Sequence, residues 1–393
     1  MKSKIKQILS IKMMLALFDV IFKYIPINVY VRLFNQQEDC WLIAERKTDA
    51  RDNGFVFFKW MRENHPEKRV IYVIDKRCND YQNVKHLGEV IKYGSLKHWY
   101  YYLASHICCD TNAGICAPNS MCYLLMRNIF PPTNKRVFLQ HGITKDYMPM
   151  LRKEKIHVDI FVCGAYPEWE YITKKFGYTD GEPKYLGFTR FDRLNNTASS
   201  NQILFMPTWR ASLDGCDNIE KTVFFNNISA LLSSNRLNTF LEESDTELVF
   251  FLHPHIRGWK HYFTTFANKH IKVLNNEDYD LQKFICSANI LITDYSSIYF
   301  DFAYQDKPVV YYQFDYDDYR LGHYAEGYFN YDNDGFGPVL KTNEDVIKCI
   351  EELYRNHWNN PENYSKRIER FFPLRDKNNC LRHYNEIIKL EYK

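Results

Sequence analysis

The chain has 393 residues, enough for two domains of ordinary size. Its formal net charge is only +3, and its basic residues are not gathered into stripes with aromatic ones, which argues against a nucleic-acid partner. The eleven cysteines are scattered, without CxxC pairs or zinc-ligand spacing, so we expect a reducing, cytoplasmic compartment.

The first 35 residues form a basic and apolar segment. Apolar residues recur at three- and four-residue spacing from Ile8 to Ile25, and the pattern ends at Pro26. Four lysines accompany them, at Lys2, Lys4, Lys6 and Lys12. This pattern predicts a helix that either lies on an anionic membrane surface or packs against the first domain. No apolar run approaches the length of a bilayer span, and no signal-peptide cleavage pattern is present.

Residues 36–195 alternate between strand and helix patterns. Predicted strands are 40–44, 70–74, 90–91, 106–109, 136–140, 159–163 and 184–186. Predicted helices are 55–63, 95–105 and 166–176. This alternation is typical of a parallel α/β sheet, and the polar run 195–201 is the predicted linker that follows it.

A second alternating series occupies residues 196–393. Its predicted strands are 202–206, 247–252, 271–274, 289–293 and 308–312, and helices close the chain from residue 344 onward. The sequence therefore predicts two Rossmann-like α/β domains in tandem, facing each other across a cleft. Ligands are expected at the carboxyl ends of the strands.

The stretch 290–302 of the second domain joins an apolar strand to a predicted helix. Ser296 and Ser297 stand where the helix N-cap is expected, and Asp301 follows Ser297 by about one helical turn. Free amides at a helix start favour an anion, so this turn is a candidate site for a phosphate or diphosphate. An ordinary serine-capped turn would give the same pattern.

Other polar residues also follow predicted strands directly. His141 and Gly142 follow the strand at 136–140, and His253 follows the strand at 247–252. Arg190, Thr208, Trp209 and Arg210 stand in corresponding places. A histidine can take a proton from a hydroxyl near neutral pH, and Gly142 lets backbone approach a ligand closely. His253, the two arginines and the serine turn would supply donors and positive charge to a diphosphate, although each arginine alone could be a surface ion-pair residue.

Other types of site are weakly indicated. Residues 315–318 have the DxD look of a metal–nucleotide site, but acidic pairs recur elsewhere, so we leave a divalent metal open and expect no tightly bound cofactor. No GxxxxGK[ST] loop and no HExxH motif occur, which argues against a P-loop NTPase and a zincin.

Taken in order, these motifs resemble the CDP-glycerol glycerophosphotransferase family, the polymerases and primases of teichoic acids and related capsule polymers. The likeness includes 45–54, 140–142, 187–192, 207–210, 253–254, 293–301, 307–308 and 337–338. It implies a GT-B-like pair of Rossmann domains. The family's commoner Trp-His-Gly-Thr-Pro is replaced here by Gln140-His-Gly-Ile-Thr, so the loop after His141 is rebuilt.

The resemblance implies a role for each matching residue. His141 matches the family's base, and His253 matches the histidine at the donor's diphosphate. The positions matching donor-binding residues are Arg190, Thr208, Ser296, Ser297 and Asp301. Gly142, Ile143, Trp209 and Arg210 complete the expected substrate-binding set.

The function implied is transfer of glycerol phosphate, or a related polyol phosphate, from a CDP-activated donor to a hydroxyl of a lipid-linked glycan. CMP would be released, at the cytoplasmic face of the membrane. One alternative is a GT-B glycosyltransferase that uses a nucleotide sugar. The other is a non-catalytic nucleotide-binding scaffold, against which the two histidines argue.

Overall fold

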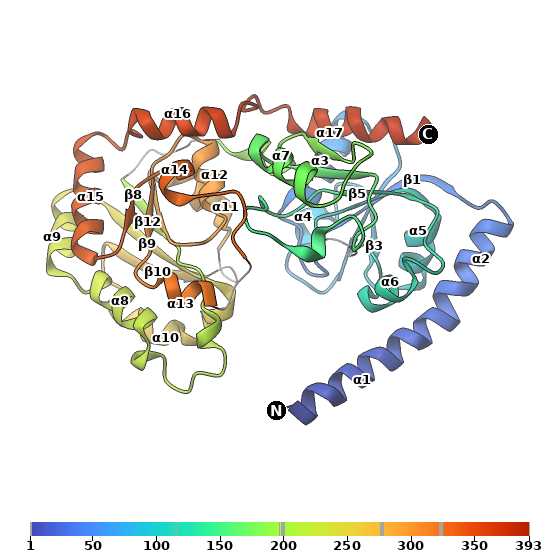
Figure 1. The fold of residues 1–393 in the computed structure, drawn as a ribbon, viewed down its shortest axis with the longest axis horizontal. Coiled ribbons are helices and arrows are strands. Elements are labelled where there is room, and N and C mark those ends of the chain that lie inside the picture. The colour runs from blue at the N-terminus through green and yellow to red at the C-terminus, as the bar shows by residue number, and fades with distance from the viewer. Residues whose placement is uncertain are drawn as a thin grey trace. The chain divides into compact units, whose positions relative to one another are not determined.

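The computed structural model describes residues 2–112, 114, 116–195, 197, 201–275, 279–321 and 325–392. The chain forms two compact units (Figure 1). Unit 1 comprises Met1–Ile143, Pro149–Arg193 and Asp376–Lys393, and unit 2 comprises Thr144–Met148 and Leu194–Arg375. The predicted division at residues 195–196 differs in two places: the last 18 residues belong to unit 1, and a five-residue segment after Ile143 belongs to unit 2.

Unit 1 is built on a seven-stranded parallel sheet of order β3-β2-β1-β4-β5-β6-β7. The strands are β1 Glu38–Ala44, β2 Val70–Ile74, β3 Glu89–Lys92, β4 Ser105–Asp110, β5 Lys135–Phe138, β6 Ile160–Cys163 and β7 Pro183–Tyr185. Strand β2 is buried at all five residues, as expected for an apolar strand covered on both faces. All seven predicted strands are present, with small differences at their ends.

Helices connect and cover this sheet. They are α3 Asn53–Asn64, α4 Tyr81–Val84, α5 Leu96–Ala104, α6 Ser120–Met126 and α7 Tyr166–Lys175, with α17 Asn379–Ile387 returning from the end of the chain. Helix α17 is tied to unit 1 by Asp192, whose carboxylate accepts from the backbone amides of Asn379 and Cys380 at 3.0 and 2.8 Å. This contact, 187 residues apart in sequence, explains why the C-terminus joins unit 1.

The N-terminal helix does not end at Pro26. It runs as α1 Lys2–Asp19, a π-helical turn Val20–Tyr24 and α2 Ile25–Leu33 (Figure 1). The proline lies near the start of α2, where its missing N–H costs little. The preceding Ile25 amide donates to the Val20 carbonyl, five residues back, so the wider turn absorbs the irregularity that the proline introduces.

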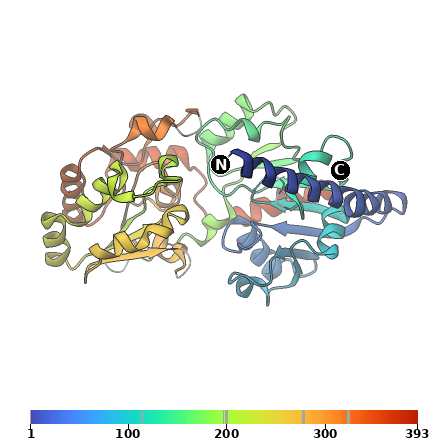
Figure 2. The ribbon, with the colours of Figure 1, turned by 90° about the horizontal axis from the view of Figure 1, so that it is seen from below.

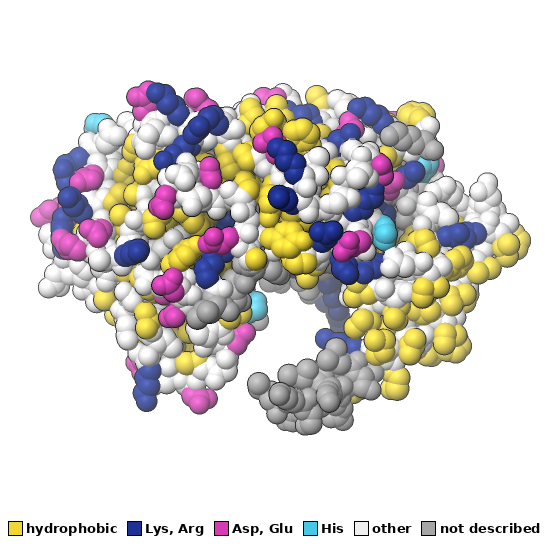
Figure 3. All heavy atoms as spheres, viewed as in Figure 1, with side chains coloured by type: hydrophobic (Ala, Val, Ile, Leu, Met, Phe, Trp, Pro, Cys, Tyr) yellow, Lys and Arg dark blue, Asp and Glu magenta, His cyan; other side chains and the backbone are white. Residues whose placement is uncertain are grey.

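This N-terminal helix has one buried and one exposed apolar face. On the buried face, the Tyr24 hydroxyl donates to the Phe130 carbonyl at 2.6 Å and Arg32 donates to the Pro131 carbonyl at 2.6 Å. On the other face, Phe18 and Phe22 are 53% and 63% exposed, among other apolar side chains (Figure 3). Both alternatives predicted from the sequence are therefore compatible with the helix, because it packs on unit 1 and still presents apolar surface.

One prediction about this segment is wrong. Residues Ile11–Leu33 form 23 residues of helix that are long and apolar enough to cross a membrane. The sequence prediction missed this because it treated Pro26 as the end of the apolar helix. Length and composition are the only criteria met here, and helices of soluble cores or signal sequences near an N-terminus meet them too.

Unit 2 is built on a six-stranded parallel sheet of order β10-β9-β8-β11-β12-β13. The strands are β8 Gln202–Phe205, β9 Glu247–Leu252, β10 Ile271–Asn275, β11 Ile290–Thr293, β12 Val309–Tyr312 and β13 Val339–Leu340. The last of these was not predicted, because two half-buried residues give no strand pattern. The sheet carries a core in which Phe205, Phe250 and Ile292 are buried.

The helices of unit 2 are short in the middle of the chain and longer near its end. They are α8 Val223–Leu232, α9 Asn235–Glu243, α10 Lys260–Phe263, α11 Leu281–Ser287, α12 Tyr299–Tyr304, α13 Tyr316–Leu321, α14 Tyr331–Asp334, α15 Asn343–Arg355 and α16 Glu362–Phe371. Figures 1 and 2 show them on both faces of the sheet. In each unit, the carboxyl ends of parallel strands form one edge at which candidate residues meet.

Candidate functional site

His141 lies just past the end of β5 in unit 1. Its ring hydrogen-bonds the backbone of Thr111, the residue after β4. The residue is exposed to solvent as a whole, but neighbouring atoms pack around its ring. They displace part of the water around the ring, and this desolvation lowers the pKa of His141. The Asp52 carboxylate opposes the shift, while Arg46 and Arg190 reinforce it. His141 is therefore neutral at pH 7, as a proton acceptor requires.

Arg190 is held beside His141 by several bonds within unit 1. Its Nη1 donates to the His141 carbonyl at 2.9 Å and to Asp52 Oδ1 at 3.1 Å. Its backbone amide donates to Asn53 Oδ1, and the Asn53 amide group donates to the Gln140 carbonyl at 2.7 Å. Arg190 and His141 thus lie at one edge of the sheet, as the sequence predicts. Asp52 and Asn53 connect them.

Glu45 organises the turn that carries Asp52. Its carboxylate accepts from the backbone amides of Arg51, Asp52 and Phe55 at 3.0, 3.1 and 2.6 Å. Burial, reinforced by the nearby Asp52 charge, raises the pKa of Glu45 to about 8, while the three amide donors favour the charged form. In the sequence, this stretch is recognisable only as one motif of the family resemblance. The buried acid directly after a strand was the signal for its role.

The residues flanking His141 adopt a specific backbone. Gln140 has a φ of 56°, a left-handed conformation, and its side-chain amide donates to the Val162 carbonyl at 2.5 Å and to Glu168 at 3.1 Å. Gly142 is half-buried and Ile143 is buried, at 5% exposure. The Ile143 side chain therefore presents little surface to a ligand, and its substrate-binding role stays a prediction.

In unit 2, Asp294 is the centre of the edge formed by β8, β11 and β12. Its Oδ1 accepts from the backbone amide of Thr208 at 2.8 Å, and its Oδ2 accepts from Arg210 at 2.7 Å. Arg210 also donates to Asp315 through Nε at 2.8 Å and Nη2 at 3.0 Å. This guanidinium is buried, with two carboxylates as partners. It therefore fixes the loops after three strands, and its contact with a ligand stays a prediction.

The serine turn differs from the predicted N-cap. Helix α12 begins at Tyr299 and its N-cap residue is Ile298, which makes no side-chain capping bond. The Ser297 carbonyl accepts from the Phe300 amide at 3.2 Å, so the chain turns once more before the helix starts. The position after an apolar strand suggested a cap at the serines. The Ser296 hydroxyl does accept from the Ile298 amide at 3.5 Å, but the extra turn makes Ile298 the N-cap residue.

The hydroxyls of the serine turn are nevertheless available at the strand edge. Ser297 is exposed and Ser296 is half-buried, whereas the Asp301 residue is buried at 5% exposure. The Thr208 Oγ1 atom is buried and makes no hydrogen bond within the described chain. A buried hydroxyl without a partner is costly, so a ligand oxygen here would stabilise it.

His253 follows β9, as predicted, and is half-buried. Its Nδ1 accepts from the His255 amide at 3.3 Å. The His255 ring lies 4.9 Å from the ring of Trp209, so the loops after β8 and β9 contact each other. Unit 2 thus brings together Thr208, Trp209 and Arg210 with His253 through this contact and through Asp294.

No group of three or more His, Cys, Asp or Glu side chains is placed to hold a metal ion among the residues that the structure describes. In the predicted DxD segment, Asp315 is the partner of Arg210 and also accepts from the Tyr295 hydroxyl at 3.2 Å. Asp315, Asp317 and Asp318 line a cavity of about 610 Å³ in unit 2, together with Arg320 and Lys341.

Comparison with known proteins places this arrangement in a family. Residues 188–389, just over half of the chain, match the family described as CDP-Glycerol:Poly(glycerophosphate) glycerophosphotransferase. The minor teichoic acid biosynthesis protein GgaB of Bacillus subtilis (strain 168) is 31% identical over 379 residues, which cover 91% of this chain and 40% of GgaB. A teichoic acid poly(glycerol phosphate) polymerase of the same organism is 22% identical, with 86% of this chain and 47% of the polymerase covered.

The chain spans less than half the length of these two relatives. Among solved structures, the wall teichoic acid polymerase TagF matches with a TM-score of 0.67 at 16% identity, covering 97% of this chain and 98% of that one. A UDP-N-acetylglucosamine 2-epimerase matches with a TM-score of 0.56 at 10% identity, covering 91% and 97%. These likenesses show the fold, a GT-B-like pair of α/β domains. By the match of residues 188–389, the chain belongs to the CDP-glycerol:poly(glycerophosphate) glycerophosphotransferase family.

Proposed function

We propose that this chain transfers glycerol phosphate, or a related polyol phosphate, from a CDP-activated donor to a hydroxyl of a teichoic-acid-type polymer. Family membership supports the donor and the class of reaction. The observation that carries the chemistry is His141, an accessible imidazole at the carboxyl end of the sheet whose pKa is lowered by burial. Family membership also favours this reaction over transfer of a sugar from a nucleotide sugar.

In the proposed reaction, His141 accepts the proton of the attacking hydroxyl. The hydroxyl oxygen forms a bond to the glycerol-bearing phosphorus of the donor, the phosphoanhydride bond breaks, and the electron pair leaves on CMP. Arg190 keeps the His141 backbone in place through the carbonyl bond at 2.9 Å. Burial keeps the imidazole neutral before the transfer, and the neighbouring Asp52 carboxylate stabilises the imidazolium that forms.

Unit 2 supplies the groups that meet the negative charge of the leaving CMP. We assign this role to His253, Ser296 and Ser297, with the Thr208 hydroxyl as a further donor. Arg210 acts differently, through Asp294 and Asp315, by holding the loops after β8, β11 and β12, which carry Thr208 and the serine turn. Donors arranged before the reaction stabilise developing charge without having to reorganise.

The N-terminal helix suits an enzyme that works on a lipid-linked acceptor at the cytoplasmic face of a membrane. Its exposed apolar face would enter the lipid interface while Tyr24 and Arg32 hold the opposite face on unit 1. Replacing Phe18 and Phe22 with serine should then abolish sedimentation with anionic vesicles. The same change at the exposed Leu381 of α17 should leave sedimentation intact, and equal loss in both proteins would contradict membrane binding by this helix.

The donor is tested by incubating the protein with an acceptor polymer and a panel of CDP-polyols and UDP-sugars. We expect acceptor-dependent CMP release from CDP-glycerol or another CDP-polyol, and no UDP release. UDP release would favour the glycosyltransferase alternative. Binding of CDP-glycerol without turnover, in a protein whose fold is intact, would favour the scaffold alternative.

A further inference from the structure

Unit 1 contains another cavity, of about 210 Å³, at the edge of its sheet opposite to His141. It is lined by residues at the starts of β5 and β6 and by α6 and the turn after it. Arg136 lies on β5 at this edge, and His141 follows the other end of the same strand. Five residues of extended chain span roughly 15 Å, so the cavity is distinct from the proposed catalytic edge.

The lining of this cavity is predominantly basic. Its ionisable residues are Arg127, Arg136, Lys153 and His157, with one carboxylate, Asp159. The Arg136 side chain is buried and contacts Asp110 at 3.3 Å, and Lys153 contacts two carboxylates, Asp180 at 2.7 Å and Glu182 at 2.5 Å. Burial lowers the pKa of His157, and the charges of Arg127, Arg136 and Lys153 lower it further, as expected where the local potential is positive. Arg127 donates to the Lys155 carbonyl and is paired with no carboxylate in the described chain, so it is the cation here that an anionic ligand would meet.

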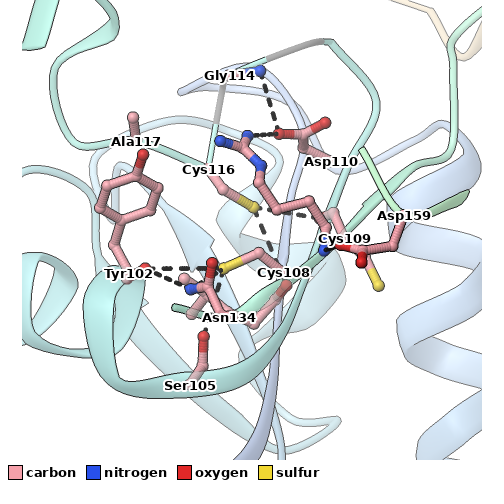
Figure 4. A network of polar contacts seen from close by, with 12 residues as sticks. Tyr102, Ser105, Cys108, Cys109, Asp110, Gly114, Cys116, Ala117, Asn134 and Asp159 are labelled. Carbon is pink, nitrogen blue, oxygen red and sulfur yellow. Dashed lines mark hydrogen bonds and ion pairs between the residues drawn. The ribbon is translucent and has the colours of Figure 1, made fainter. Parts of the chain in front are cut away.

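Three polar atoms of the lining residues make no hydrogen bond within the described chain. They are the Tyr123 hydroxyl, Asn134 Oδ1 and Arg127 Nε. Asn134 is held through its other atom, because its amide nitrogen donates to the Tyr102 carbonyl at 2.7 Å and to Cys108 Sγ at 3.2 Å (Figure 4). Leaving a buried polar group without a partner costs about 1–3 kcal/mol, and more when the group is charged. All three atoms belong to residues that line this one cavity.

The chemical types of these atoms define the ligand further. Arg127 Nε can only donate a hydrogen bond, and it lies on a guanidinium that favours a phosphate oxygen. Asn134 Oδ1 can only accept, so it requires a hydroxyl or amine on the ligand. The Tyr123 hydroxyl can do either, and its ring lies 4.5 Å from the Arg136 guanidinium and 5.9 Å from that of Arg127. A cavity this small suits one small group rather than a nucleotide.

We infer that this cavity binds a polyol phosphate group, with its phosphate against Arg127 and Arg136 and a hydroxyl against Asn134. This inference rests on the proposed function for its biological meaning, since a polyol phosphate is the repeating unit of the proposed product. Held here, an acceptor chain would stay on unit 1 between successive transfers. A glycerophospholipid headgroup carries the same chemistry, and the cavity residues Pro131 and Pro132 adjoin the carbonyl that anchors Arg32 of α2.

The test is a calorimetric titration of the full chain with glycerol 3-phosphate in the absence of any CDP compound. We expect saturable binding that excess CDP does not displace and that His141→Ala retains. Tyr123→Phe and Arg127→Gln should each weaken this binding about tenfold or more, because each removes one direct bond. Tyr123→Phe should not lower the melting temperature, since the hydroxyl that it removes has no partner in the protein.

Lys155→Gln is the matched control, because Lys155 is exposed beside the cavity without lining it. A second titration uses phosphatidylglycerol vesicles and proteins that also carry Phe18→Ser and Phe22→Ser, so that the N-terminal helix does not contribute, and it identifies the source of the ligand. Loss of vesicle binding in Arg127→Gln, with no binding of free glycerol 3-phosphate, would assign the site to a lipid headgroup. Absence of binding to both probes, or equal affinity in Tyr123→Phe, Arg127→Gln and the control, would overturn the inference. Neither titration requires transferase activity, so failure of the proposed function would leave these results interpretable.

Discussion

Each unit carries an arginine at the carboxyl end of its sheet, and the two guanidiniums have different partners. In unit 1, Arg190 contacts one carboxylate and the His141 carbonyl, and its side chain is 11% exposed. In unit 2, Arg210 contacts two carboxylates, Asp294 and Asp315, and all three side chains are buried. The comparison shows that arginines at the same end of two related sheets can have different roles. Arg190, after the edge strand β7, adjusts the charge beside a proposed base, and Arg210, after the inner strand β8, holds three loops together.

The largest effect that follows from this difference is on stability. Arg210→Met should destabilise unit 2 by about 3–5 kcal/mol, because it leaves two buried carboxylates without their cation. Arg190→Met should cost about 1 kcal/mol, since Asp52 remains partly exposed to water. Chemical denaturation of the two variants measures this directly. Equal losses would show that the two arginines are structurally equivalent.

The next effect concerns the proposed base. His141→Ala should reduce turnover by about a hundredfold or more, the usual loss when a general base is removed. Donor binding should persist, since the groups assigned to the donor lie on unit 2. Steady-state kinetics with a CDP-glycerol binding isotherm separates the two quantities. Unchanged turnover in a folded variant would remove His141 from the mechanism.

A smaller effect is expected for the groups assigned to the diphosphate. Ser297→Ala or His253→Ala should weaken CDP-glycerol binding by about 1.5–3 kcal/mol, the range for hydrogen bonds to charged groups. Cytidine, which has no phosphate, should bind each variant as it binds the parent protein. Ser233→Ala, at an exposed position of the same unit, is the control. Equal losses for cytidine and CDP-glycerol would contradict a phosphate role for these residues.

The smallest effect is on the pH dependence of the rate. Activity should fall as the pH drops through the lowered pKa of His141, because the imidazolium cannot accept a proton. Asp52→Asn removes a carboxylate that raises this pKa, so the acid limb should move to lower pH. Arg190→Gln removes a cation that lowers it, so the limb should move to higher pH. Shifts of kcat/KM in the same direction would contradict this electrostatic account.

Much of the fold could be predicted from local pattern. Apolar runs such as Val70–Ile74 and Glu247–Leu252 are strands with the predicted bounds, because buried parallel strands are continuous apolar segments. Pro26 misled the prediction, since a π-helical turn accommodates it without ending the helix. The N-cap of α12 was predicted at Ser296 and Ser297, whereas the helix begins at Tyr299. The extra turn before the helix has no recognisable sequence pattern.

What could not be predicted depends on contacts between distant residues. Arg210 contacts the carboxylates of Asp294 and Asp315, which are 84 and 105 residues away in the sequence. No local sequence pattern predicts these two partners. The return of the C-terminus to unit 1 through Asp192 is of the same kind. Glu45, by contrast, directly follows an apolar strand in the sequence. Its burial at the turn could therefore have been predicted.

The most direct test of the central claim is to analyse both products of one reaction. The acceptor is incubated with the protein and CDP-glycerol labelled with carbon-13 in the glycerol, and CMP is quantified while the acceptor is examined by mass spectrometry and phosphorus NMR. The account predicts one CMP released for each labelled glycerol phosphate gained by the acceptor, joined through a new phosphodiester. CMP released without any gain by the acceptor, or an acceptor that gains a sugar from a nucleotide sugar instead, would contradict it.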